Sequence, residues 1–122
     1  MDKDVKLSEL VKIRDWMYTN CYGFRQAKTR HEICAALEMN DRKFRKIAQE
    51  LKLTNDIASL SSVGYFFVPL ITSDKEEIEA VRHSIMEDYS RAHSQLKEAR
   101  RRMDNFHIRF AEERQIEMMI EG

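Results

Sequence analysis

Residues 70–121 contain neither glycine nor proline, and this uninterrupted stretch limits the possible folds of the chain more than any other feature. Ser73-Asp74-Lys75-Glu76 has the spacing of a capping box, in which the first side chain and the fourth bond each other's backbone. Glu77 and Glu79 add negative charge to the first turn, where the helix dipole favours it. We therefore predict a single helix of about 45 residues, roughly 65 Å long.

Apolar side chains recur along this predicted helix in two seven-residue repeats that are offset by four residues. Such a pattern is typical of the a/d seam of a coiled coil. A helix of this length cannot bury its whole stripe against a domain of ~70 residues, so we expect a homodimer. The alternative is a helix that folds back on its own domain. The predicted dimerisation residues are Ile78, Ile85, Tyr89, Ala92, Leu96, Ala99, Met103, Phe106 and Phe110. Glu113 and Glu117 interrupt the repeats, so the last turns are expected to fray or to bind another protein.

The first 72 residues have a different texture, with short apolar stretches separated by turn residues. Residues 4–22 are predicted to form a helix before Gly23, with one apolar stripe. That stripe comprises Leu7, Leu10, Val11, Met17, Tyr18 and Cys21. A capping box at Thr29–Glu32 begins a second helix, which is predicted to end near Glu38.

A tight break at 38–41 leads into a third predicted helix, which ends near Leu53. Asn40 or Asp41 is suited to cap it, and Asn40 also tolerates a left-handed backbone in the turn. Its apolar residues follow the i, i+3, i+4, i+7 spacing of a buried face. They are Phe44, Ile47, Ala48 and Leu51. Two short apolar runs, 57–60 and 65–68, surround a Ser/Gly turn and predict a β-hairpin.

Two helices joined by a tight turn and followed at once by a hairpin resemble the winged helix-turn-helix DNA-binding family. The resemblance is carried by residues 29–53 and 59–68, with Val63-Gly64-Tyr65 at the wing, and it covers roughly residues 5–70. Small phage- or prophage-type proteins are the most similar, since their Asn-Asp-Arg-Lys-Phe-Arg helix precedes a Ser-rich turn and Gly-Tyr. The resemblance implies a mostly α protein with a winged-helix domain at 1–72 and a long coiled-coil-like dimerisation helix at 73–122. It also implies sequence-specific binding of double-stranded DNA, as a transcription regulator or a replication accessory protein.

The third helix would place its donors opposite its apolar face, as a helix in the major groove must. Arg suits guanine edges and Gln suits adenine edges, whereas hydroxyls and nearby cations bond phosphates. The predicted DNA-binding residues are Lys28, Arg30, Asn40, Arg42, Lys43, Arg45, Lys46, Gln49, Ser61, Ser62 and Tyr65. The plainer interpretation is a solvated basic face and a wing that only closes the core. The wing has no lysine or arginine, which argues against a role in the minor groove.

Charge is unevenly distributed although its sum is zero. Residues 1–53 carry 12 Lys/Arg and 8 Asp/Glu (+4), residues 54–73 carry −1, and residues 74–122 carry 9 Lys/Arg and 12 Asp/Glu (−3). The basic N-terminal part fits a polyanionic partner, and the acidic remainder suggests a separate role. Two other readings stay open. One is a protein–protein adaptor that uses the winged domain and the coiled coil. The other is a regulator that binds a small molecule between Trp16, Tyr18 and the long helix.

Catalysis and cofactor binding find no support in the sequence. No nucleophile–base set, Gly-rich phosphate loop or paired carboxylate motif is present, so we expect no enzyme and no cofactor. Cys21, His31 and Cys34 have no evident fourth ligand, so no metal site is expected. The two cysteines suit a reducing cytoplasm. Neither a secretory signal nor a run of ~18 apolar residues is evident, so no membrane partner is expected.

Overall fold

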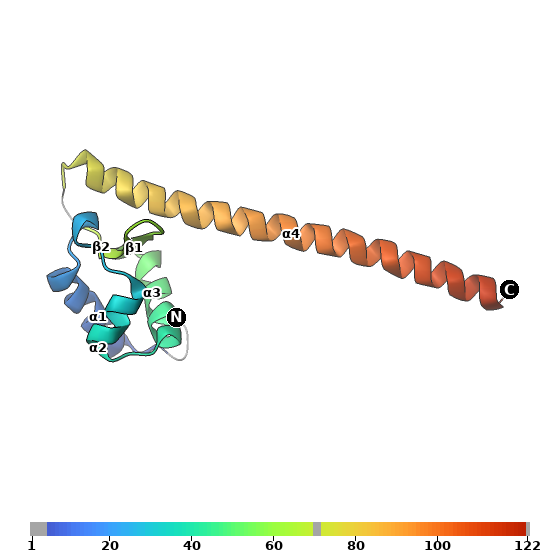
Figure 1. The fold of residues 1–122 in the computed structure, drawn as a ribbon, viewed down its shortest axis with the longest axis horizontal. Coiled ribbons are helices and arrows are strands. Elements are labelled where there is room, and N and C mark those ends of the chain that lie inside the picture. Colours follow the sequence, from blue (N-terminus) through green and yellow to red (C-terminus); the bar gives the residue numbers. More distant parts are fainter. Residues whose placement is uncertain (1–4, 70–71, 122) are drawn as a thin grey trace. The chain divides into compact units, whose positions relative to one another are not determined.

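The computed structural model describes residues 5–69 and 72–121, and Figure 1 shows the order of their elements. The helices are α1 (Leu7–Asn20), the 3-10 helix η1 (Phe24–Gln26), α2 (Arg30–Leu37), α3 (Asp41–Leu53) and α4 (Lys75–Glu121). The strands β1 (Ile57–Leu60) and β2 (Gly64–Phe67) form an antiparallel hairpin. The described chain is therefore mostly helical, with one hairpin and a long C-terminal helix, as predicted.

The chain divides into two units, residues 1–87 and residues 88–122. The sequence places the boundary earlier, at 72/73. The first unit also includes the first turns of α4 because Glu77, Ala80 and Ser84 are buried there. The Ser84 hydroxyl accepts a hydrogen bond from the Ser59 backbone N–H of β1 at 3.1 Å.

The buried face of α1 differs from the predicted stripe. Ile13 and Met17 are buried inside the helix, and Cys21 is buried just after its end. Leu7, Val11 and Tyr18 are exposed, so their placement on the core side was wrong. The core packs on the face that carries Ile13 and Met17, one helical turn apart, and this face is rotated from the predicted stripe. α1 also ends at Asn20, before the predicted end at residue 22.

Local hydrogen bonds fix the ends of α2 and the start of α3. The Thr29 hydroxyl accepts from the Glu32 N–H at 3.2 Å, and the Glu32 carboxylate accepts from the Thr29 N–H at 3.2 Å, which confirms the predicted capping box. The Asn40 side chain accepts from the Lys43 N–H at 2.8 Å and caps α3. The left-handed residue of the turn is Glu38 (φ 51°), whereas Asn40 is extended (φ −75°). Glu38 and not Asn40 therefore supplies the left-handed backbone of the turn, because an N-cap residue is extended.

The hairpin closes the core of the first unit. Its register pairs Ile57 with Phe67 and Leu60 with Gly64. The Tyr65 N–H donates to the Lys28 carbonyl at 2.8 Å and the Lys28 N–H donates to the Tyr65 carbonyl at 3.0 Å, so β2 is also tied to the segment before α2. The main buried cluster contains Val5, Ile13, Met17, Cys21, Ile33, Phe44, Ile47, Ala48, Leu51, Ile57 and Phe67.

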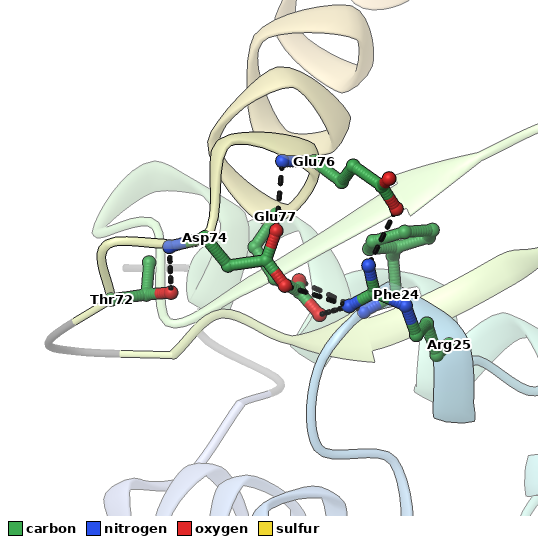
Figure 2. Close-up of polar contacts among 6 residues, drawn as sticks. All are labelled: Phe24, Arg25, Thr72, Asp74, Glu76 and Glu77. Carbon is green, nitrogen blue, oxygen red and sulfur yellow. Dashed lines mark hydrogen bonds and ion pairs between the residues drawn. The ribbon is translucent and has the colours of Figure 1, made fainter.

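A group of charged residues anchors the start of α4 to η1 (Figure 2). The Arg25 guanidinium lies 2.9 Å from Asp74 and 2.5 Å from Glu76, and the buried Glu77 accepts from the Phe24 N–H at 3.1 Å. The Asp74 side chain accepts from the Glu76 N–H at 2.9 Å, so Asp74 caps α4. The predicted capping role of Ser73 was therefore wrong. The hydrogen bond from Arg25 holds the pKa of Asp74 below its usual value.

Candidate nucleic-acid interface

α3 presents a polar face opposite its buried one. Phe44, Ile47, Ala48 and Leu51 are buried in the core, as predicted. Arg42, Arg45 and Gln49 are exposed, whereas Lys43 and Lys46 are half-buried. This placement follows from the 100° step of the helix, which puts residues 42, 45 and 49 on the side away from Phe44 and Leu51. The helix can therefore offer guanidinium and amide groups to a ligand outside the domain.

Carboxylates of the same unit pair with Lys43 and Arg45. Asp41 lies 3.0 Å from Arg45 and also contacts Arg30 at the start of α2. Lys43 lies 2.6 Å from Glu9 of α1. The hydrogen bond from Lys43 is the main cause that lowers the pKa of Glu9. Arg42 has no ion-pair partner within the described ranges 5–69 and 72–121, so it is the cation most available to a phosphate.

The two predicted contacts at the start of α2 have different environments. The Lys28 ammonium is half-buried and donates to the Asn20 carbonyl at 2.9 Å, so it satisfies the C-terminal end of α1. Such a bond to a helix C-terminus stabilises the fold. Arg30, in contrast, meets Asp41 and belongs to the charged group at the start of α3. Arg30 therefore lies beside the exposed face of α3, whereas the ammonium of Lys28 is bonded to the end of α1.

The wing is less suited to phosphate than the sequence suggests. The Ser61 hydroxyl and N–H bond the Glu87 carboxylate at 3.0 and 3.1 Å. A carboxylate at this turn repels a phosphate. Tyr65 is half-buried, with its ring 5.1 Å from Phe44 and the Lys52 ammonium 5.2 Å over it. Of the three predicted wing residues, only Ser62 is exposed and makes no hydrogen bond or ion pair within residues 5–69 and 72–121. Tyr65 packs at the edge of the core, against Phe44.

Sequence reasoning missed the acidic partners of this surface. Glu9 and Glu87 lie 34 and 26 residues from the side chains they bond, so no local pattern indicated them. Asp41 was considered only as a helix cap. Its spacing of four residues from Arg45 is the signal of a helical ion pair and could have been used.

The two cysteines and the aromatic residues Trp16 and Tyr18 lie in or against the core of the first unit. Cys21 is buried and Cys34 is half-buried, and burial raises the pKa of both thiols. No group of three or more His, Cys, Asp or Glu side chains lies in metal-binding proximity among residues 5–69 and 72–121. The Tyr18 ring packs edge-on against Phe67 at 5.2 Å, and Trp16 packs on the main core. In the same described ranges, no helix has the length and apolar character needed to cross a lipid bilayer.

The predicted dimerisation residues form an exposed stripe along α4. In the first unit, Ile78 and Ile85 are 43% and 52% exposed. In residues 88–121, Tyr89, Leu96, Met103, Phe106 and Phe110 are 50% exposed or more, and Ala92 and Ala99 are also exposed. A hollow on the helix surface is lined by Ala99, Arg102, Met103 and Phe106. At the aromatic end of the stripe, the rings of Phe106 and Phe110 stack with their centroids 6.3 Å apart.

Comparison of the chain with protein-family models, with curated proteins and with solved structures found no match.

Proposed function

We propose that this protein binds double-stranded DNA through the exposed face of α3 and associates with itself through α4. In this proposal the first unit is a winged helix-turn-helix domain. The cellular role is that of a phage-type transcription regulator or replication accessory protein. α3 enters the major groove, where Arg42 and Arg45 meet guanine edges or phosphates and Gln49 meets an adenine edge.

The observation that carries the proposal is the exposed Arg42–Arg45–Gln49 face, which follows a short turn and is backed by a fully buried apolar face. A rigid helix that holds its donors outward is the form in which base edges are read. The hairpin packs against the same core, since Tyr65 contacts Phe44. This packing fixes the orientation of α3 within the domain.

The ion pairs with Asp41 and Glu9 shape the expected binding. Exposed ion pairs contribute little stability, so phosphates can replace Asp41 as the partner of Arg30 and Arg45. Arg42 needs no such exchange. We therefore expect modest non-specific affinity and a shallow salt dependence, corresponding to a few phosphate contacts per domain.

The test is a salt titration of binding to a random-sequence duplex, measured by fluorescence anisotropy. The double variant Arg42→Ala/Arg45→Ala is compared with Lys12→Ala/Lys75→Ala, which removes the same charge from exposed sites on α1 and α4. We expect the α3 variant to bind roughly tenfold or more weakly and to lose about 1–2 units of the log–log salt slope. The control variant should bind like the wild-type protein.

Equal losses in the two variants would show that only net charge matters, and the assignment of α3 would be wrong. Absence of binding at about 50 mM salt by a folded protein would remove the DNA proposal itself, because phosphate attraction is strong there.

A second candidate is a protein–protein adaptor, and Glu87 at the wing favours it. The carboxylate that bonds Ser61 places negative charge where a wing would approach phosphate. An adaptor would instead offer this face and the α4 stripe to proteins. Glu87→Gln tests whether the wing lies beside the DNA, because it removes the repulsion but keeps a hydrogen-bond acceptor. Tighter DNA binding by Glu87→Gln supports the wing as a DNA neighbour, and unchanged binding means that the wing lies away from the DNA, where a protein partner can reach it.

A further inference from the structure

The helix between residues 88 and 121 exposes apolar side chains in a single stripe at coiled-coil spacing. One seven-residue repeat consists of Tyr89, Leu96, Met103 and Phe110. Phe106 belongs to the other seven-residue repeat. An exposed stripe of this kind is normally covered by another helix. How a second copy covers the stripe rests on the self-association part of the proposed function and not on DNA binding.

Two acidic residues continue the apolar repeats toward the C-terminus. Glu113 follows Phe106 by seven residues, and Glu117 follows Phe110 by seven residues. In a parallel pair in register, each seam position faces the same position of the other copy. Glu113 would then face Glu113 of the second copy, and Glu117 would face Glu117. Like charges that face each other across a helix interface are destabilising.

The positions that flank the seam are basic. Arg100, His107 and Arg114 each follow a residue of the repeat that contains Phe106, and Arg102 and Arg109 each precede a residue of the repeat that contains Phe110. In a parallel pair, a residue that flanks the seam in one copy faces the residue five positions later in the other copy. Arg109 would then face Arg114 of the second copy, and Arg102 would face His107. A parallel pair would thus set acid against acid in the seam and cation against cation beside it.

An antiparallel pair removes the conflict between acidic residues in the seam. Residues 113–117 of one copy then lie across from residues 92–103 of the other, a stretch that contains Arg100 and Arg102. The small residues Ala92 and Ala99 leave room opposite the long glutamates, and the hollow beside Ala99 is bordered by Arg102. Acidic seam residues therefore meet cations, and large side chains meet small ones.

We propose that α4 pairs with α4 of a second copy in antiparallel orientation, with the twofold axis near residues 104–108. Asp88 begins the second unit in each copy. The two Asp88 residues then lie at opposite ends of the helix pair, about 50–60 Å apart along its axis. If the first unit binds DNA as proposed, one dimer holds two separate DNA segments or widely spaced half-sites, because adjacent half-sites lie only ~34 Å apart.

Distances between spin labels on the two copies test the orientation. Labels are placed singly at Ser90, Lys97 and Asp104, which are exposed and share one heptad position. The background is Cys34→Ala, and the fully buried Cys21 is retained. We expect the distance to be shortest at Asp104 and to grow by about 21 Å with each seven-residue step away from it. Dilution with unlabelled protein must remove the signal.

Equal distances at the three sites would establish a parallel pair and overturn the proposal. A monomeric mass in analytical ultracentrifugation would overturn self-association itself. DNA binding is measured separately by anisotropy, so a failure of DNA binding is distinguished from both outcomes.

Charge reversal gives a second, independent readout. Glu113→Lys/Glu117→Lys is expected to weaken the dimer roughly tenfold in an antiparallel pair, since acid–cation contacts become repulsive. Adding Arg100→Glu/Arg102→Glu restores the affinity. The control Glu112→Lys, which lies outside the seam, leaves it unchanged. Failure of the compensating pair to restore affinity would contradict the antiparallel assignment.

Discussion

The two units of this chain differ in the burial of their large apolar side chains. In residues 1–87, Phe44, Ile47 and Phe66 are fully buried. In residues 88–121, Phe106 is 61% exposed and Phe110 is 50% exposed. The first unit therefore carries its own core, whereas the contacts of the second are those within one helix, such as the Arg91–Asp88 ion pair and the stacked rings of Phe106 and Phe110. An isolated helix is marginal in water, so the proposed self-association would stabilise the second unit.

Replacing one phenylalanine in each unit should give the largest contrast. Phe44→Ala removes a fully buried ring and is expected to lower the free energy of unfolding of the first unit by about 3–5 kcal/mol. Phe106→Ala should change it by less than about 0.5 kcal/mol. Urea unfolding followed by Trp16 fluorescence measures both, because Trp16 is the single tryptophan and lies in α1.

Similar losses in Phe44→Ala and Phe106→Ala would break the comparison. They would indicate that α4 folds back on the first unit, which is the alternative that the sequence left open. The mass of Phe106→Ala in solution completes the test, since loss of the dimer with an intact first unit places the role of Phe106 in self-association.

A smaller effect is expected at Gly64, where the hairpin meets the segment before α2. Gly64 has φ +105°, and a Cβ there would lie 2.3 Å from the Lys28 carbonyl oxygen. Both the strained backbone and the clash oppose a side chain. Gly64→Ala should lower the free energy of unfolding by about 2–4 kcal/mol, whereas the exposed neighbour Ser62→Ala should have little effect. Equal stabilities of the two variants would show that β2 is not fixed to Lys28.

The elements that sequence predicted correctly are those with local signals. The capping box at Thr29, the cap at Asn40 and the buried face of α3 each depend on residues within seven positions of one another. The hairpin was predicted from two short apolar runs around a Ser/Gly turn. The long helix followed from the absence of glycine and proline. For each of these, the side chains that decide the structure are near neighbours in the sequence.

The parts that sequence missed depend on contacts between distant segments. The Arg25–Asp74, Lys43–Glu9 and Ser61–Glu87 contacts join residues 49, 34 and 26 positions apart, and each changes the candidate surface or the start of α4. The rotated face of α1 has the same origin, because the other elements decide which side is covered. The DNA-binding and dimerisation residues stay predictions.

Asn40 caps α3 and was also predicted as a DNA contact, so variants at this position can separate its effect on stability from its effect on DNA binding. Asn40→Ala should lower the free energy of unfolding by about 1 kcal/mol through loss of the cap. Asn40→Asp keeps the cap but adds negative charge, so it should weaken DNA binding without a loss of stability. The matched change Asn105→Ala in the second unit should leave the stability of the first unit unchanged. A destabilised Asn40→Asp would contradict the capping role.

The smallest expected effect is a loss of stability at low pH, where the contact between Arg25 of η1 and Asp74 at the start of α4 weakens. Arg25 lowers the pKa of Asp74 in the folded state, so the contact stabilises the fold above the ordinary aspartate pKa of about 4. That stabilisation is lost as the pH falls through the lowered pKa. Asp74→Asn retains a capping oxygen but no charge, so its urea midpoint should decline less than that of the wild-type protein between about pH 5 and pH 3. The matched variant Asp104→Asn, in the second unit, should decline like the wild-type protein. Identical profiles for all three proteins would mean that the ion pair with Arg25 does not stabilise the start of α4, which would leave the buried Glu77 and its bond to Phe24 as the anchor.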